Sequence, residues 1–127
     1  MAGDGRHAID AVSRVREACL SLPDARERVS HGEPTWFAGG GKAFAMFADH
    51  HHDDRVAVWA AAPDGAQGRL VADDPDGCFV PPYVGGRGWV GIRLDVPDVD
   101  WDRVEQVLHD AYRTVASRTL LRLLDPP

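Results

Sequence analysis

The spacing of apolar residues predicts two amphipathic helices, one near each end of the chain. Between residues 7 and 22 the apolar positions recur every three or four residues, which is the period of an α-helix with one buried face. These positions are Ala8, Val12, Val15, Cys19 and Leu22. Pro23 is expected to end this helix, because the residue before a proline disfavours the helical conformation.

The second amphipathic helix is predicted over residues 101–115. Asp100 precedes it and is expected to cap it, because a side-chain oxygen at that position accepts a hydrogen bond from an amide of the first turn. A short last helix, capped by Ser117, is expected to follow. The apolar stripe of the long helix is Trp101, Val104, Leu108, Ala111, Tyr112 and Val115, and the short helix carries Leu120, Leu121, Leu123 and Leu124.

The middle of the chain shows the shorter alternating pattern that is typical of β-strands. Two extended pieces within residues 29–38 are expected to flank a Gly32-Glu33-Pro34 turn, and three glycines at 39–41 supply the next hairpin connection. A helix capped by Asp64 and continuing through Leu70 and Val71 is predicted next. The remaining strands are predicted over residues 42–48, 55–60, 78–80 and 88–95.

This order of elements predicts an α+β fold in which helices cover an antiparallel β-sheet. The predicted order is α-β(3-4)-α-β(2)-α-α, and strands joined by turns this short must pair antiparallel. A chain of 127 residues is large enough for one hydrophobic core, so residues 1–127 are expected to form a single domain.

Composition narrows the range of partners. The formal net charge is -6, which opposes non-specific attraction to nucleic acids or anionic membranes, so a nucleic-acid partner requires a local basic patch. No apolar run is long enough to span a membrane, and the N-terminus lacks the pattern of a signal peptide, which predicts a cytoplasmic location. Cys19 and Cys78 are expected to be buried free thiols.

The glycine-rich segment at residues 81–95 carries the strongest functional signal. Its Gly85-Gly86-Arg87-Gly88 turn is expected to present Tyr83, Arg87 and Trp89 around an exposed backbone. An arginine there can contact a phosphate, and an aromatic ring can stack on a base. The alternative is a tight turn whose aromatic rings close the core. The candidate binding residues are Lys42, Tyr83, Arg87, Trp89, Arg93 and Trp36.

Two other arrangements of reactive side chains suggest chemistry, but neither predicts a site. His50-His51-His52 suggests a metal site, but consecutive residues on an extended turn point in different directions, so neither a metal nor a cofactor is predicted. Cys19 and His109 could form a nucleophile and its base. Because Cys19 lies on the apolar stripe of its helix, it is expected to pack in the core, and no enzymatic activity is predicted.

Several segments together resemble the MmcQ/YjbR family. The first group is Leu22-Pro23, the stretch at residues 31–36 and the stretch at residues 41–45. The second group is residues 82–92, Val99-Asp100-Trp101, and the stretch at residues 111–116. The resemblance implies a compact α+β domain similar to the type III secretion chaperones. It also implies DNA binding through a double-wing arrangement.

The leading hypothesis is therefore a small cytoplasmic binding domain that contacts DNA through its hairpin tips, weakly and with strong salt dependence. A protein- or peptide-binding module is the main alternative, because the secretion-chaperone-like sheet can offer apolar strand faces to a polypeptide. A small-ligand binder is the third. A contiguous basic strip favours nucleic acid, whereas an apolar groove favours a polypeptide.

Overall fold

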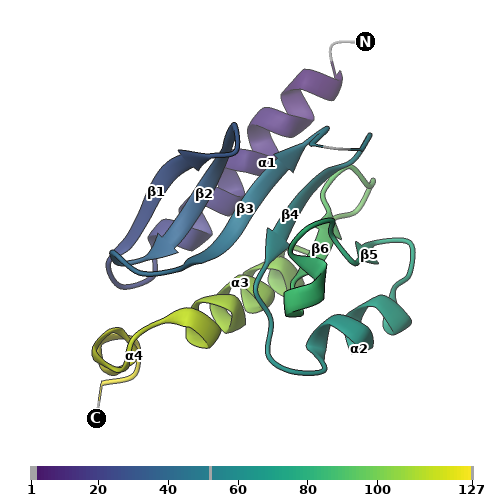
Figure 1. The fold of residues 1–127 in the computed structure, drawn as a ribbon. Helices are drawn as coiled ribbons and strands as arrows, with labels where there is room; N and C mark the ends of the chain where they lie inside the picture. Colours follow the sequence, from purple (N-terminus) through teal and green to yellow (C-terminus); the bar gives the residue numbers. More distant parts are fainter. Residues whose placement is uncertain (1–2, 52, 127) are drawn as a thin grey trace.

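The computed structural model describes residues 3–51 and 53–126, with side chains from residue 10 onward. The described residues form a six-stranded β-sheet, four α-helices and one short 3-10 helix (Figure 1). The strands are β1 (Ala25–Ser30), β2 (Glu33–Ala38), β3 (Ala43–Asp49), β4 (Val56–Ala60), β5 (Cys78–Phe79) and β6 (Val90–Arg93). The helices are α1 (Gly3–Leu20), α2 (Ala66–Asp73), η1 (Gly85–Arg87), α3 (Trp101–Val115) and α4 (Arg118–Leu124).

The sheet confirms the predicted antiparallel α+β fold. Its strand order is β1-β2-β3-β4-β6-β5, and every neighbouring pair is antiparallel. The first four strands form a meander of short hairpins. The chain then leaves through α2, returns as the edge strand β5, and inserts β6 between β5 and β4.

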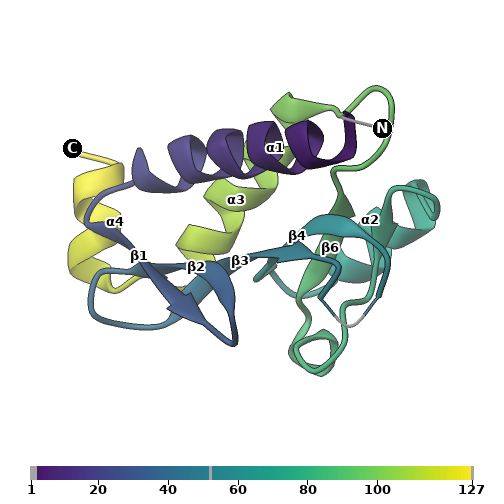
Figure 2. The same ribbon diagram turned by 90° about the horizontal axis from the view of Figure 1, so that it is seen from above.

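Helices α1 and α3 cover one face of the sheet, and the core lies between them and the strands (Figure 2). The register places Trp36, Ala45, Ala60 and Val90 side by side across β2, β3, β4 and β6, and all four are fully buried. Glu27 lies opposite Trp36 on β1. Its carboxylate accepts hydrogen bonds from Arg16 of α1 (2.8 Å) and from the Trp36 indole (2.9 Å), which ties the edge strand to the covering helix.

Helix α3 carries the predicted buried stripe. The Asp100 carboxylate accepts a hydrogen bond from the Arg103 amide (3.1 Å), as expected for a capping residue. The Tyr112 hydroxyl donates to the carbonyl of Pro23 (2.6 Å), and its ring meets Phe44 of β3 edge-on. The buried residues of this helix are Val104, Val107, Leu108, Ala111 and Tyr112.

The first hairpin differs from the sequence prediction. Strand β1 begins at Ala25, four residues earlier than predicted. The sequence pattern does not show this start because most residues of β1 are polar and exposed, as an edge strand allows. The turn is at His31 and Gly32, with φ of 55° and 81°, rather than at Gly32-Glu33-Pro34. Two central residues with positive φ match the right-handed twist of a two-residue hairpin, so Glu33 and Pro34 belong to β2.

Three further predictions need correction. Asp64 does not cap α2: the capping position is Gly65, whose φ is 83°, and no side chain caps the helix there. The glycine-rich loop contains the short helix η1, which the sequence did not indicate. Helix α1 begins at Gly3 rather than at residue 7, a difference at the end of the helix that the apolar pattern does not define.

Within the part of the chain that the structure describes, no helix combines the length and apolar character needed to cross a membrane. Cys19 and Cys78 are both buried free thiols, as predicted.

Candidate nucleic-acid interface

Two connections leave the sheet at the same end, which we call the wing end. Ala45 near the start of β3 is level with Ala60 at the end of β4, and Ala60 pairs with Val90 at the start of β6. The β2–β3 turn at residues 39–42 and the β5–β6 loop at residues 80–89 therefore both lie at this end. The β3–β4 connection lies at the opposite end, together with residues 94–100 that follow β6.

The β5–β6 loop is anchored at its base and exposed at its tip. The Gln67 side chain of α2 donates to the carbonyls of Gly85 (2.8 Å) and Trp89 (2.6 Å), and Pro81 is fully buried. At the tip, Tyr83 is 79% exposed and has a φ of 65°. A left-handed backbone is unfavourable for a residue with a Cβ, so the anchored loop holds Tyr83 outward at a conformational cost.

Arg87 and Trp89, predicted to act together, lie in different environments. Trp89 is only 8% exposed and belongs to the core, so its ring is not presented to a ligand. Arg87 is exposed, and its guanidinium carbon lies 5.6 Å from the centre of the Trp89 ring. The residue that this loop offers for phosphate contact is Arg87, while Trp89 supports it from below.

The β2–β3 turn presents Lys42 at the wing end. Backbone hydrogen bonds from Ala38 to Lys42 (3.0 Å) and from Gly41 to Ala38 (3.1 Å) close the turn, and Lys42 is exposed. Trp36, on the strand before the turn, is fully buried and faces α1. The structure therefore gives Trp36 a structural position and leaves Lys42 as the side chain that this turn offers to a partner.

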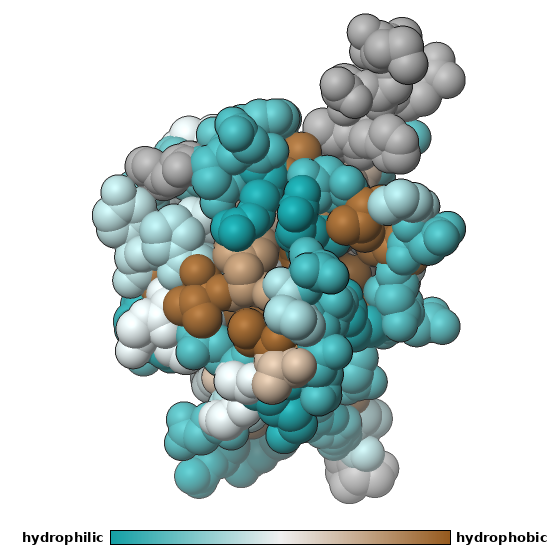
Figure 3. Space-filling model, turned by 90° about the vertical axis from the view of Figure 1, so that its right-hand side faces the viewer, coloured by the Kyte–Doolittle hydropathy of each residue, from teal (hydrophilic) through white to brown (hydrophobic). Residues whose placement is uncertain are grey.

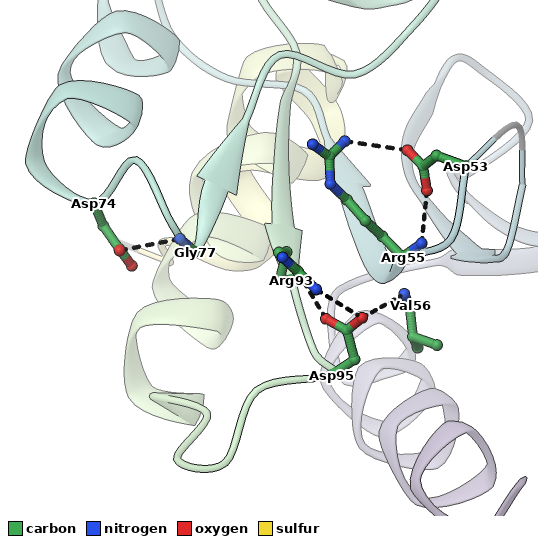
Figure 4. Close-up of polar contacts among 7 residues, drawn as sticks. All are labelled: Asp53, Arg55, Val56, Asp74, Gly77, Arg93 and Asp95. Atoms are coloured by element: carbon green, nitrogen blue, oxygen red, sulfur yellow. Dashed lines mark hydrogen bonds and ion pairs between the residues drawn. The ribbon is translucent and has the colours of Figure 1, made fainter. Parts of the chain in front are cut away.

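Arg93 lies at the other end of the sheet and is neutralised there. Its guanidinium donates two hydrogen bonds to Asp95 (2.9 and 3.1 Å), and the contact with Asp95 raises the pKa of Arg93 (Figure 4). Beside it, Arg55 pairs with Asp53 at 3.1 Å. Since Arg93 is level with Ala57 on β4, and Ala57 with Ala48 on β3, roughly six residues of strand, or about 20 Å, separate it from Lys42.

The charges of the described residues divide between the two ends of the sheet. The end that carries Arg93 holds many carboxylates, and we call it the acidic end. These are Glu33, Asp49, Asp53, Asp54, Asp95, Asp98 and Asp100. At the wing end, Lys42 and Arg87 have no carboxylate partner among the described side chains. The wing end also holds carboxylates, among them Asp24, which pairs with Arg26, and the exposed Asp64.

In the β3–β4 connection, His50 and His51 do not converge on one point. The His50 imidazole is hydrogen-bonded to Asp49 (2.6 Å), and His51 packs edge-on against Trp59 with ring centres 5.7 Å apart. His52 lies outside the described residues. Among the residues that are described, no three potential metal ligands are grouped closely enough to hold an ion.

We predict that a metal chelator leaves the melting temperature of the protein unchanged. Metal stabilises a fold only where a preorganised ligand set couples ion binding to folding, and His50 and His51 are engaged with different neighbours. Thermal unfolding followed by circular dichroism, with and without chelator, measures this. A stoichiometric zinc ion that survives dialysis and raises the melting temperature would contradict the prediction.

Comparisons with known proteins agree with the architecture described above. A protein-family model described as YjbR matches residues 20–114. The chain is also similar to the crystal structure of the Deinococcus radiodurans protein DR2400, which contains a DUF419 domain. That similarity has a TM-score of 0.68 at 15% sequence identity and covers 91% of this chain and 88% of the other. None of the curated proteins matches this chain.

Proposed function

The chain belongs to the YjbR family, and we propose that it is a non-enzymatic domain that binds nucleic acid through its wing end. The observation that carries the proposal is the pair of exposed cations, Lys42 and Arg87, on two connections that leave the same end of one sheet. We take these two connections as the two wings that the resemblance implied; strand β4 lies between the strand pairs that they join. Phosphate contacts from unpaired Lys and Arg supply most of the affinity in non-specific nucleic-acid binding.

The separation of charge between the two ends reconciles this proposal with a net charge of -6. The acidic end keeps its arginines paired, as with Arg93 and Asp95, whereas Lys42 and Arg87 keep their positive charge free at the wing end. Charges farther apart than about 10 Å are largely screened from each other at moderate salt. A phosphate at the wing end therefore interacts mainly with the local cations and less with the distant carboxylates.

The environment of Cys19, the nucleophile considered in the sequence, agrees with a binding role rather than a catalytic one. Cys19 is fully buried on the stripe of α1, and burial raises the pKa of its thiol far above the usual range. A thiol that stays protonated is a poor nucleophile. His109, which the sequence suggested as the general base for Cys19, instead accepts a hydrogen bond from Arg113 of the same helix.

A polypeptide partner is the second candidate, because the same loop exposes apolar surface. Val80 is 55% exposed and lies three residues before Tyr83. On the side of the molecule that carries α2 and β5, however, apolar residues form small groups separated by polar ones (Figure 3). Protein interaction sites are more often marked by one contiguous apolar patch, and this face does not offer one.

The test is a salt-dependent titration of a short labelled DNA duplex, followed by fluorescence anisotropy. We expect a dissociation constant on the order of micromolar at low salt, with little dependence on base sequence. Arg87→Ala and Lys42→Ala should each weaken binding and reduce the slope of log affinity against log salt by about one unit, since each removes one phosphate contact.

Arg93→Ala is the matched control, because it removes the same charge from the acidic end. It should leave the salt slope unchanged. If Arg93→Ala and Arg87→Ala weaken binding equally, net charge alone explains the affinity and the wing end has no special role. If the protein binds no DNA at low salt, the nucleic-acid proposal fails.

A further inference from the structure

The sheet has a second face, which α1 and α3 do not cover. The register aligns one residue from each strand in a row across this open face: Arg28, Thr35, Met46, Trp59, Gly91 and Phe79. Figure 1 looks onto this face, with α1 and α3 behind the strands. The row alternates in each strand with the buried residues that face the helices, such as Trp36 and Ala45.

The two halves of this face differ in what covers them. Over β4 to β6, Trp59 and Phe79 are almost completely buried: His51 packs against Trp59, and the Arg55 guanidinium lies 4.0 Å from the centre of the Phe79 ring. Over β1 to β3, Phe37 and Met46 remain half-buried, although Thr35 in the same part of the face is only 3% exposed. Arg28 lies 4.0 Å from the centre of the Phe37 ring, and this guanidinium is itself exposed.

The uncovered half also carries free positive charge. Arg28 has no carboxylate partner among the described residues, and Lys42 lies in the turn that links β2 to β3. The nearby acids are already engaged. Asp24 pairs with Arg26, and Glu33 accepts a hydrogen bond from the Asp49 amide at 2.7 Å. This half therefore combines a ring, a thioether and the Arg28 guanidinium on a sheet surface, with Lys42 in the turn at its edge.

We propose that a single-stranded nucleic acid lies across this half of the open face, with a base stacked on Phe37 and Met46 and its phosphates contacting Arg28 and Lys42. This inference rests on the proposed function and adds an unpaired strand, bound on the open face, to the duplex bound at the wing end. Bases in a duplex are stacked on one another and offer no face to a sheet, whereas an unpaired base does. The charges suit a polyanion, and a base that stacks on Phe37 takes the place of the Arg28 guanidinium on that ring, which leaves Arg28 to contact a phosphate.

The chain contains only two methionines, Met1 and Met46, which makes the methyl group of Met46 a specific probe of this surface. In protein labelled with ¹³C at the methionine methyl groups, the Met46 signal, assigned with Met46→Leu, should shift when an oligothymidylate is added at low salt. A base stacked nearby changes the ring-current field at the methyl group. A duplex of similar length, and an oligoglutamate that supplies charge without bases, should leave the signal in place.

Phe37→Leu tests the stacking directly, because it keeps an apolar side chain and removes the aromatic face. Base–aromatic stacking is worth about 1–3 kcal/mol per base, so we expect single-strand affinity to fall by roughly 5-fold to 150-fold while duplex affinity stays the same. Val29→Ala is the matched control. Val29 is exposed and follows Arg28 on β1, so it projects to the opposite face, and its loss should change neither affinity.

Each outcome decides between the two proposals. Arg87-dependent duplex binding, with no Met46 shift and no effect of Phe37→Leu on single strands, would overturn the open-face site and leave the wing-end proposal standing. An equal Met46 shift with oligoglutamate would also overturn it, in favour of a response to charge or to an acidic polypeptide. If neither single strands nor duplexes bind, both proposals fail.

Discussion

Replacing Leu108 with alanine is expected to lower the free energy of unfolding by about 2–5 kcal/mol. Leu108 is 1% exposed and lies at the centre of the α3 stripe, between the helix and the sheet. The truncation removes three buried carbon atoms and leaves a cavity. The buried residues Val104 and Tyr112 on the same stripe cannot fill it without moving. Urea unfolding followed by circular dichroism measures the change.

The control for this variant is Glu105→Ala on the same helix. Glu105 is exposed, and its replacement should change stability by no more than about 0.5 kcal/mol. A loss of less than about 1 kcal/mol for Leu108→Ala would show that α3 does not pack on the sheet as described.

The second large effect is expected at Gly91, where a single methyl group should cost about 1–3 kcal/mol. Gly91 lies on the open face between Trp59 and Phe79, and the Phe79 ring occupies the space in front of its Cα. A Cβ on Gly91 would overlap that ring. Because Arg55 stacks on the outer side of Phe79, Gly91→Ala must displace the whole stack or distort β6.

Gly86→Ala is the matched control, since it makes the same chemical change within the same glycine-rich segment. A Cβ at Gly86 meets no atom within 4 Å, and the residue does not have a positive φ. Its effect should stay within about 0.5 kcal/mol. Equal stability of the Gly91 variant and the wild type would show that the Phe79 ring does not cover the strand.

The elements that bury one regular face were predictable from the sequence. The stripe of α3 and its Asp100 cap follow from the local sequence, which does not depend on distant contacts, and the apolar run of β4, buried on both faces, follows from its composition. Strand β1 did not follow, because an edge strand such as Ala-Arg-Glu-Arg-Val-Ser has too little buried surface to show alternation. The left-handed His31 turn was also hidden, since histidine adopts a positive φ more often than most residues do but still only in a small minority of positions.

The candidate site was predicted in part, because its residues come from segments far apart in the chain. The exposure of Tyr83 and Arg87 follows from the local turn, and both were identified. The burial of Trp89 does not, because it depends on α2 and on the Gln67 anchor. The sequence could not place Lys42 and Arg93 at opposite ends of the sheet, since that requires the pairing of β3, β4 and β6.

The row on the open face had no sequence signal for the same reason. Arg28, Met46 and Phe79 lie in one row only because of the register of the six strands. A one-residue shift in any pairing would move a side chain of that strand to the helix-covered face.

The central claim is that the wing end is the surface that meets nucleic acid, and amide mapping by NMR tests it most directly. On titration of ¹⁵N-labelled protein with a short DNA duplex at low salt, we expect shifts at residues 39–42 and 83–88. The amides of Asp49, Asp53 and Asp54 at the acidic end should not move. Shifts confined to the acidic end, or no shifts at saturating DNA, would contradict the claim.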